Sequence, residues 1–223
     1  MIRARVVVFD VNETLSDLTP MGQRFADVGA PEWTAKVWFA SLLRDGFALA
    51  AAGTTERFAT IGSSALRSVL TGLALTHDLD AAIEHIMGGF FELPVHDDVP
   101  EAVRDLAAAG ARLVTLSNGS TDVAERLFAA AGIRDHFEQL LSVEDAGVWE
   151  PAPGAYAYAV RTCGVDPGDT LLVAVHPWDI DGARRAGLRT AWVNRDRGTY
   201  PDCFLAPDHV LSALSELAVF ARD

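Results

Sequence analysis

The sequence predicts an α/β protein with a doubly wound parallel sheet and an inserted all-helical segment. Val6–Phe9 are four consecutive apolar residues, as expected of a strand buried on both faces. After Pro100 the chain alternates between helical and apolar strand segments, which is typical of such a sheet. We therefore expect a Rossmann-like core built from residues 1–15 and 98–223, and a helical cap domain built from residues 16–97.

The first predicted strand ends in an aspartate. Asp10 follows Phe9 directly, and the carboxyl ends of parallel strands form the edge at which open α/β sheets bind ligands. Asp10 is therefore a candidate nucleophile. The alternative is that Asp10 only caps a turn, because the Asp, Asn and Thr residues of the 10–14 segment all suit turns.

The inserted segment shows helical spacing without a convincing strand. Apolar residues recur at this spacing over residues 33–47 and 58–70. A threonine of the 54–55 pair is expected to cap the second helix, and Asp78 to begin a third. Pro94 and the polar residues after it are expected to end the insertion and lead back into the core.

The remaining core elements follow from apolar runs and from glycines that end helices. We expect helices over residues 101–109, 122–131, 155–163 and 180–186, and strands over residues 112–116, 139–143, 170–175 and 190–194. Polar residues follow three of the predicted strands: Asp10 with Thr14, Ser117 with Asn118, and the turn from His176 to Asp179. In a parallel sheet these groups converge on one edge.

Composition limits the function. Half of the 223 residues are hydrophobic, as in a globular protein, and the formal net charge is −13 without a basic cluster, which disfavours nucleic acid as a partner. No run has membrane-spanning length or the form of a signal peptide, and two unclustered cysteines fit a reducing cytoplasm. Neither GxGxxG nor GxxxxGK[ST] is present, so nucleotide cofactors lack support. The oligomeric state stays open, a homodimer included.

The motifs resemble the haloacid dehalogenase (HAD) superfamily over nearly the whole chain. The resemblance rests on Phe9-Asp10 followed by Thr14-Leu15, on the helical insertion just after them, and on Leu116-Ser117-Asn118-Gly119. It implies that Asp10 is the nucleophile. The superfamily carries out several chemistries, so the branch has to be inferred from the site.

Two positions disfavour the phosphatase branch of the superfamily. That branch uses a second aspartate two residues after the nucleophile as a general acid, and a Gly-Asp pair to hold magnesium; here Asn12 and Val175 stand at those positions. An amide does not exchange a proton as a carboxyl does, and valine does not bind a cation. A phosphatase is therefore the less favoured alternative.

The chain looks instead like the L-2-haloacid dehalogenase, or type II, branch. The matching features are Ser117-Asn118-Gly119-Ser120, Leu141-Ser142-Val143, Pro151, Tyr156, Trp178-Asp179 with Gly182-Ala183, and Trp192-Val193-Asn194-Arg195. The resemblance implies that Asp10 displaces halide from a small 2-haloacid and that water then hydrolyses the aspartyl ester. It further implies that Thr14, Ser117 and Asn118 fix this carboxylate and hold the substrate.

The first departure from that branch lies in the first cap helix. The branch places an arginine, linked to the substrate and the leaving halide, just after the tryptophan, but here Trp38 is followed by Phe39. Arg44 is the nearest cation. Because five residues correspond to about 140° around a helix, Arg44 faces elsewhere unless the helix is rotated.

The second departure is Glu150, which stands where the branch carries a lysine that neutralises the nucleophile. An anion beside Asp10 and Asp179 gathers three carboxylates, which raises the pKa of at least one of them. Either the reaction is lost, or another positive charge replaces the lysine; the candidates are His176, Arg44 and a divalent cation. His176 is also a candidate base for activating water. Two alternatives for Glu150 are that it points to solvent or that it is a laboratory substitution.

We therefore expect a 2-haloacid dehalogenase-like hydrolase that acts on a small acid, its turnover weakened by Glu150 and Phe39. A catalytically altered or inactive HAD-fold protein that binds a small molecule is the alternative. No cofactor is expected, and a divalent cation such as Mg²⁺ is less favoured. The expected catalytic residues are Asp10, Thr14, Ser117, Asn118, Glu150, His176 and Asp179, and the expected substrate contacts are Val11, Asn12, Phe39, Arg44, Tyr156 and Trp178.

Overall fold

The computed structural model describes residues 5–219 and contains one six-stranded sheet with the strand order β3-β2-β1-β4-β5-β6. The strands are β1 (Val6–Phe9), β2 (Arg112–Ser117), β3 (Phe137–Ser142), β4 (Thr170–Ala174), β5 (Arg189–Val193) and β6 (His209–Leu211). All neighbouring strands pair in parallel. The predicted doubly wound α/β fold is therefore confirmed. Residues 1–4 and 220–223, which the prediction assigns to the core, lie outside the described residues.

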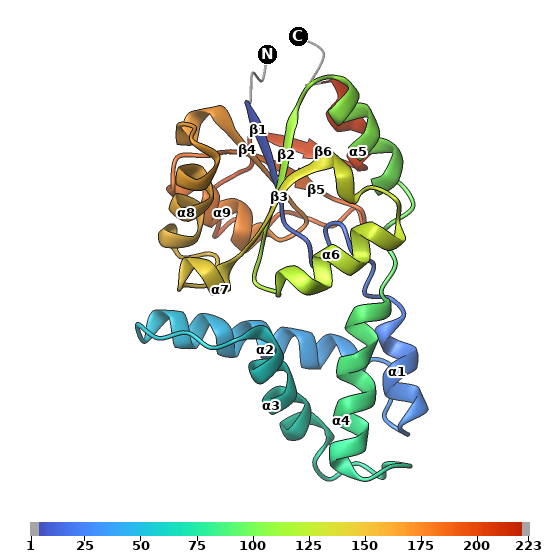
Figure 1. Ribbon diagram of the computed structural model, residues 1–223. Coiled ribbons are helices and arrows are strands. Elements are labelled where there is room, and N and C mark those ends of the chain that lie inside the picture. The colour runs from blue at the N-terminus through green and yellow to red at the C-terminus, as the bar shows by residue number, and fades with distance from the viewer. Residues whose placement is uncertain (1–4, 220–223) are drawn as a thin grey trace.

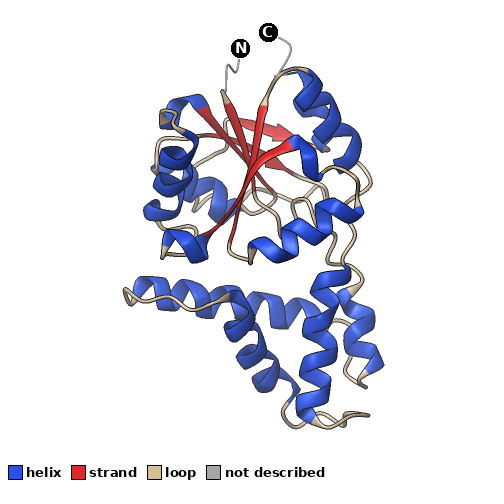
Figure 2. Ribbon diagram, in the orientation of Figure 1, coloured by secondary structure: helices blue, strands red, loops and turns tan. Residues whose placement is uncertain are grey.

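Helices cover both faces of the sheet, with α5 and α6 on one face and α8 and α9 on the other (Figures 1 and 2). The helices of the core are α5 (Val99–Ala108), α6 (Thr121–Ala130), α7 (Val143–Ala146), α8 (Pro153–Cys163) and α9 (Pro177–Arg185), and the short 3-10 helices are η2 (Arg134–His136), η3 (Pro167–Asp169) and η4 (Leu214–Val219). The right-handed crossovers of a parallel sheet produce this two-sided cover.

Strand β1 is central because every one of its side chains is buried. It pairs with β2 on one side and with β4 on the other, and Phe9 lies beside Thr115 and Val173. Parallel pairing carries the residues after these strands to the same edge of the sheet. The ends of β1, β2 and β4 therefore meet where the sequence predicted a site.

Residues 16–97 form helices and contribute no strand to the sheet. They contain α1 (Met21–Asp27), α2 (Thr34–Ala51), α3 (Phe58–Leu70), α4 (Leu79–Gly88) and η1 (Gly89–Glu92). These helices lie together beyond one edge of the sheet (Figure 1). An isolated antiparallel bridge between Ser16 and Val95 ties the two ends of the segment together. The division into two domains at these boundaries stays a prediction.

Trp38 of α2 organises the packing among these helices. Its ring centroid lies 5.8 Å from that of Phe25 in α1 and 5.5 Å from that of Phe90 in η1. The indole Nε1–H donates to the carbonyl oxygen of Gly62 in α3 over 2.9 Å. A fully buried tryptophan needs such an acceptor for its only donor, so one side chain joins four elements.

Trp149 connects these helices to the core. Its ring stacks on Phe58 of α3 with a centroid distance of 6.2 Å, and its Nε1–H donates to the carbonyl oxygen of Glu56 over 3.0 Å. Gly46 of α2 faces the same ring so closely that an added Cβ would lie 2.5 Å from it. Glycine at this position therefore lets α2 approach the residue that precedes Glu150.

Several local predictions need correction. The cap of α3 is Arg57 without a side-chain hydrogen bond, so no threonine caps this helix. Asp78 does cap α4, because its Oδ1 accepts from the backbone N–H of Ala81 over 2.9 Å. The turn expected from His176 to Asp179 is the first turn of α9, since proline is favoured at the first position of a helix. Helix α1 and the edge strand β6 were not predicted. No helix within residues 5–219 is long and apolar enough to cross a membrane.

Candidate active site

The carboxylate of Asp10 is fixed at the end of β1 by hydrogen bonds to both of its oxygens. Oδ1 accepts from the backbone N–H of Val11 over 2.7 Å, and Oδ2 accepts from the hydroxyl of Thr14 over 2.6 Å. The Thr14 Oγ1 in turn accepts from the backbone N–H of Val175 over 3.0 Å. Thr14 thus joins the ends of β1 and β4, and both Asp10 and Thr14 are buried. The predicted role of Thr14 in fixing Asp10 agrees with these contacts.

His176 stands beside this carboxylate. Its Nε2 lies 3.1 Å from the carbonyl oxygen of Asn12 and 3.7 Å from Oδ2 of Asp10. A carbonyl oxygen only accepts hydrogen bonds, so Nε2 carries the proton in this contact. The ring also stacks on Trp178, with a centroid distance of 4.9 Å. His176 therefore donates its Nε2–H to the Asn12 carbonyl beside Asp10, and Nε2 is not the atom that takes a proton from water.

Glu13 completes the environment of His176 and was not predicted. Its Oε2 lies 3.6 Å from Nε2 of His176, and its backbone has a φ of 62°, a left-handed conformation that is uncommon for residues other than glycine. Nε2 of His96 lies 2.9 Å from the carbonyl oxygen of Glu13, within hydrogen-bonding distance. The sequence predicts site roles for the other residues of the segment from Asp10 to Thr14, with a turn as the alternative, but its spacing does not show that Glu13 faces His176.

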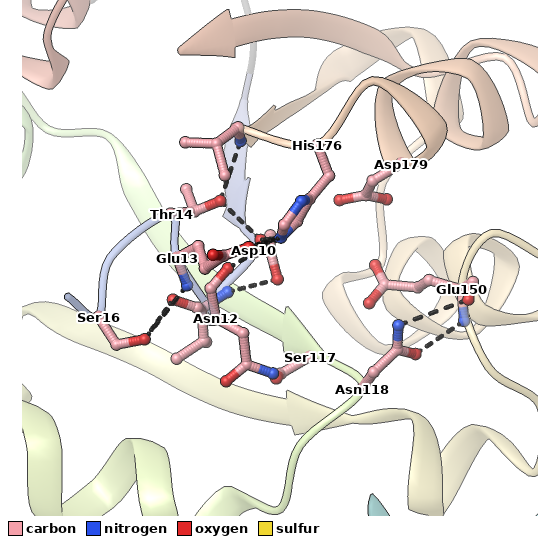
Figure 3. A network of polar contacts seen from close by, with 12 residues as sticks. Asp10, Asn12, Glu13, Thr14, Ser16, Ser117, Asn118, Glu150, His176 and Asp179 are labelled. Carbon is pink, nitrogen blue, oxygen red and sulfur yellow. Dashed lines mark hydrogen bonds and ion pairs between the residues drawn. The ribbon is translucent and has the colours of Figure 1, made fainter. Parts of the chain in front are cut away.

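Glu150 is buried in the site, so it does not point to solvent. Glu150 is 1% exposed, and neither of its carboxylate oxygens has a hydrogen-bond partner among the described residues. Its backbone is held by the side chain of Asn118: the N–H of Glu150 donates to Oδ1 over 2.9 Å, and Nδ2 donates to the carbonyl oxygen of Glu150 over 3.4 Å. Figure 3 shows the Glu150 carboxylate facing those of Asp10 and Asp179.

Asp179, in the first turn of α9, is the third carboxylate. Its Oδ1 accepts from the hydroxyl of Tyr156 in α8 over 2.6 Å, whereas its Oδ2 has no partner among the described residues. Both residues are fully buried. The structure thus brings together Asp10, Glu150, Asp179 and Tyr156, as the sequence predicted.

Burial controls the ionisation of this cluster, because it disfavours the charged form of every group. It raises the pKa of Asp10 to about 7, against the hydrogen bonds from Thr14 and Val11 that lower it. Burial, with the charges of Asp179 and Asp10, raises the pKa of Glu150 well above its usual range. Burial also raises the pKa of Asp179 and lowers the pKa of His176, which favours the neutral imidazole.

Ser117 and Asn118 are buried at the same edge but do not fix Asp10 as predicted. The Ser117 hydroxyl oxygen accepts from the backbone N–H of Gly119 over 2.9 Å, and the Asn118 amide is engaged with the Glu150 backbone. Among the described residues neither side chain hydrogen bonds to the Asp10 carboxylate. Ser117 ends β2 and bonds to the backbone two residues further on, as short polar side chains often do. Asn118 follows β2 and binds the backbone of Glu150, which is distant in the sequence.

A cavity of about 760 Å³ adjoins the cluster. Glu13 and His176 line it on the core side, and Trp38 and Phe39 of α2 line it on the cap side, whereas Asp10 does not reach its wall. The predicted position of Phe39 at a pocket therefore agrees with the structure. Phe47 of α2 is not among the lining residues and packs on Trp178, with a centroid distance of 4.9 Å.

Of the two side chains predicted as candidates for the positive charge, His176 lines this cavity and Arg44 does not. Arg44 lies outside the cavity lining, pairs with Asp45 over 2.8 Å and has a side chain that is 70% exposed, so the structure does not bring it to the cluster. Lys36 of α2 does line the cavity and has no ion pair within residues 5–219. Lys36 precedes Phe39 by about one helical turn, so both lie on the face of α2 that lines the cavity, whereas Arg44 lies outside it.

Arg195 is a further residue to which the sequence assigned no role. Its guanidinium binds both carboxylate oxygens of Asp98 over 2.8 and 2.7 Å, and its Nη2 donates to the carbonyl oxygen of Thr14 over 3.0 Å. Such a paired guanidinium fixes geometry more than it supplies charge. Arg195 thus supports the segment that carries Asp10. Within residues 5–219 no group of three His, Cys, Asp or Glu residues is arranged to hold a metal ion.

A buried aspartate thus stands at the carboxyl end of the central parallel strand, at the edge where open α/β sheets bind ligands. The family model of haloacid dehalogenase-like hydrolases matches residues 4–187. The chain therefore belongs to this hydrolase family, and the resemblance inferred from its motifs is confirmed.

Within the family the chain is similar to 2-haloacid dehalogenases. It is 31% identical over 221 residues to (S)-2-haloacid dehalogenase 2 of Pseudomonas sp. (strain CBS-3), covering 97% of this chain and 95% of that relative. The crystal structure of a dehalogenase with an intermediate complex superposes with a TM-score of 0.92 at 26% identity, covering 100% and 99% of the two chains. The L-2-haloacid dehalogenase of Xanthobacter autotrophicus with chloropropionic acid covalently bound superposes with a TM-score of 0.86 at 26% identity, covering 98% of each chain.

Proposed function

We propose that this protein hydrolyses small 2-haloacids, with Asp10 displacing the halide through an aspartyl-ester intermediate. The observation that carries this proposal is the buried carboxylate of Asp10, which is oriented at the sheet edge by Val11 and Thr14 over 2.7 and 2.6 Å. Both hydrogen bonds favour the ionised form and hold it in one rotamer, as a carboxylate nucleophile requires. The 2-haloacid dehalogenases among its relatives support the reaction class.

In the first step one oxygen of Asp10 attacks the carbon that bears the halogen, and the halide leaves with the bonding electrons. The ionised carboxylate is the effective nucleophile, because the neutral carboxylic acid attacks carbon far more slowly. Because the pKa of Asp10 is raised to about 7, ester formation should increase as pH rises through about 7. The covalently bound chloropropionic acid named for the Xanthobacter autotrophicus dehalogenase supports a covalent intermediate of this kind.

In the second step water attacks the carbonyl carbon of the Asp10 ester. Asp179 is the base that we propose for this water, because its Oδ2 has no partner among the described residues and is free to accept a proton. The hydroxyl of Tyr156 holds the other oxygen of Asp179 over 2.6 Å. This assignment replaces His176 as the base, and His176 then acts as a hydrogen-bond donor beside Asp10.

The cavity lined by Phe39, Trp38 and Lys36 is the route that we propose for the substrate. The ammonium of Lys36 attracts an acid, and the aromatic rings suit the apolar part of a haloacid. His176 and Glu13 lie between this cavity and Asp10. A small acid as the substrate, with no cofactor, fits a reaction in which a carboxylate is the nucleophile.

Chloride release from 2-chloropropionate tests this proposal. The wild-type protein should release chloride, whereas Asp10→Asn should release less than about one thousandth as much, because a neutral amide is a poor nucleophile. Exposed Asp105 provides a matched control, and Asp105→Asn should keep wild-type activity. A single turnover in water enriched in heavy oxygen should label the Asp10 carboxylate. Equal chloride release from wild type and Asp10→Asn would refute the nucleophile assignment.

One observation favours a second candidate, a relative with altered chemistry that binds a small acid without displacing halide. Glu150 brings an acidic group to the position where the dehalogenase branch carries a lysine, and Phe39 replaces an arginine. Under this alternative 2-chloropropionate would bind, as measured by calorimetry, but the wild-type protein would release no chloride.

A further inference from the structure

We propose that Glu150 is held as a neutral carboxylic acid and donates its proton to the departing 2-hydroxy acid when the Asp10 ester is hydrolysed. This inference rests on the proposed function and assigns a general acid to its second step. It differs from both outcomes that the sequence suggested, since neither loss of the reaction nor a replacement cation is required. Protonation removes the negative charge of Glu150, so no additional cation is needed beside Asp10.

The first argument is the isolation of the Glu150 carboxyl group. The residue is 1% exposed, and neither Oε atom has a hydrogen-bond partner among the described residues. No lysine, arginine or histidine within residues 5–219 forms an ion pair with it. An ionised carboxylate in such a place is shielded from solvent and has no counter-ion among the described residues, so the neutral acid is the stable form.

The second argument locates the proton among the three carboxyl groups. Asp10 accepts hydrogen bonds from Val11 and Thr14, and Asp179 accepts one from Tyr156. Donors stabilise the ionised form of the group that accepts from them. Glu150 accepts none from the described residues, so a proton shared by the cluster resides on Glu150.

The groups that face Glu150 reinforce this placement. Asp10 faces it from the end of β1, and Asp179 faces it from α9 (Figure 3). Tyr156 of α8 lies close enough to all three acids for their charges to raise its pKa. Two of these neighbours are acids and the third is a phenol, so none of them carries a positive charge that would favour ionisation of Glu150. Burial and the charges of Asp179 and Asp10 raise the pKa of Glu150 in agreement with the geometry.

The backbone holds this acid in a defined position. The Asn118 side chain binds the N–H of Glu150 over 2.9 Å and its carbonyl oxygen over 3.4 Å. The preceding Trp149 is anchored against the cap by its ring and its Nε1–H. The backbone of Glu150 is therefore fixed from both sides, which limits the positions that its carboxyl group can take, as a general acid requires.

Hydrolysis of the Asp10 ester consumes one water and conserves every proton. Asp179 takes one proton from water, and the hydroxide adds to the carbonyl carbon of the Asp10 ester. The tetrahedral intermediate then collapses with cleavage of the bond between that carbon and the ester oxygen. The leaving alkoxide takes the proton of Glu150 and departs as the 2-hydroxy acid. Asp179 returns its proton to Glu150, and Asp10 releases the second proton of the water to solvent.

Rapid-mixing measurements on Glu150→Gln test this step, because glutamine keeps the shape and neutrality of the acid but has no acidic proton to transfer. With 2-chloropropionate we expect a first-turnover burst of chloride close to that of wild type, followed by ester hydrolysis slowed at least about 100-fold, in the range of general acid catalysis. Mass spectrometry should then find the ester accumulated on Asp10. Glu150→Asp should recover part of the hydrolysis rate, and Glu84→Gln, at an exposed position of α4, should match wild type.

Two kinetic results would overturn the proposal: ester hydrolysis by Glu150→Gln at the wild-type rate, or loss of the chloride burst in the folded variant. Infrared spectroscopy provides a readout that does not depend on activity. At about pH 8, above the pKa of about 7 for Asp10, the wild-type protein should show the C=O stretch of a buried carboxylic acid, and Glu150→Gln should lack it. If wild type releases no chloride, the proposed function fails, and the infrared band alone still decides the ionisation of Glu150. If Glu150→Gln does not fold, absence of the band from wild type refutes the proposal.

Discussion

Replacing Asp10 with asparagine measures how the buried carboxylate changes the free energy of unfolding with pH. The amide side chain keeps the size of the carboxylate and removes its titration. Burial raises the pKa of Asp10 from 3.8 to about 7, so the folded chain binds a proton more readily than the unfolded chain does. The contribution of Asp10 to stability is therefore fully present below about pH 3.8 and is lost as pH rises through about 7.

The size of this effect follows from the pKa difference. A difference of about 3 pKa units corresponds to about 4 kcal/mol in the free energy of unfolding over the whole titration. Between about pH 5 and about pH 8 the expected change is about 3 kcal/mol, because part of the titration lies at lower pH. The altered hydrogen bond to Thr14 adds an offset that does not depend on pH, so only the pH dependence carries the test.

Urea unfolding of both proteins over this pH range gives the comparison. The free energy of unfolding of wild type, minus that of Asp10→Asn, should fall by about 3 kcal/mol from about pH 5 to about pH 8. Asp105→Asn, at an exposed position, should run parallel to wild type. Parallel curves for Asp10→Asn as well would show that Asp10 titrates alike in both states, and the argument from burial would be wrong.

Two further substitutions test the electrostatics and the packing. Glu150→Lys places an ammonium beside Asp10 and should lower its pKa, so the acid limb of the pH profile for chloride release should move below about 7; an unchanged limb would contradict this. Gly46→Ala places a methyl group 2.5 Å from the Trp149 ring and should destabilise the fold by about 1–3 kcal/mol in urea unfolding. Gly88→Ala meets no atom within 4 Å and should stabilise it by about 0.5–1 kcal/mol; equal effects would refute the packing argument.

The sequence by itself determined the architecture of the sheet and the place of the site. The apolar run of Val6–Phe9 identified a central strand, and polar residues after three strands predicted that Asp10, Ser117 and Asp179 meet at one edge. These inferences succeed because hydrophobic periodicity is local and because parallel pairing leaves one edge for all strand ends. The short edge strand β6 escaped prediction, since three residues of mixed exposure show no such pattern.

Only the tertiary structure decided how the side chains of the site are used. The sequence indicated that Glu150 joins two aspartates, but its protonation depends on whether donors from distant elements reach its oxygens. The rotation of α2 likewise decides that Lys36, and not Arg44, lines the cavity. Burial, pairing and ionisation depend on atoms that are far apart in the chain, and no local pattern of residues contains those distances.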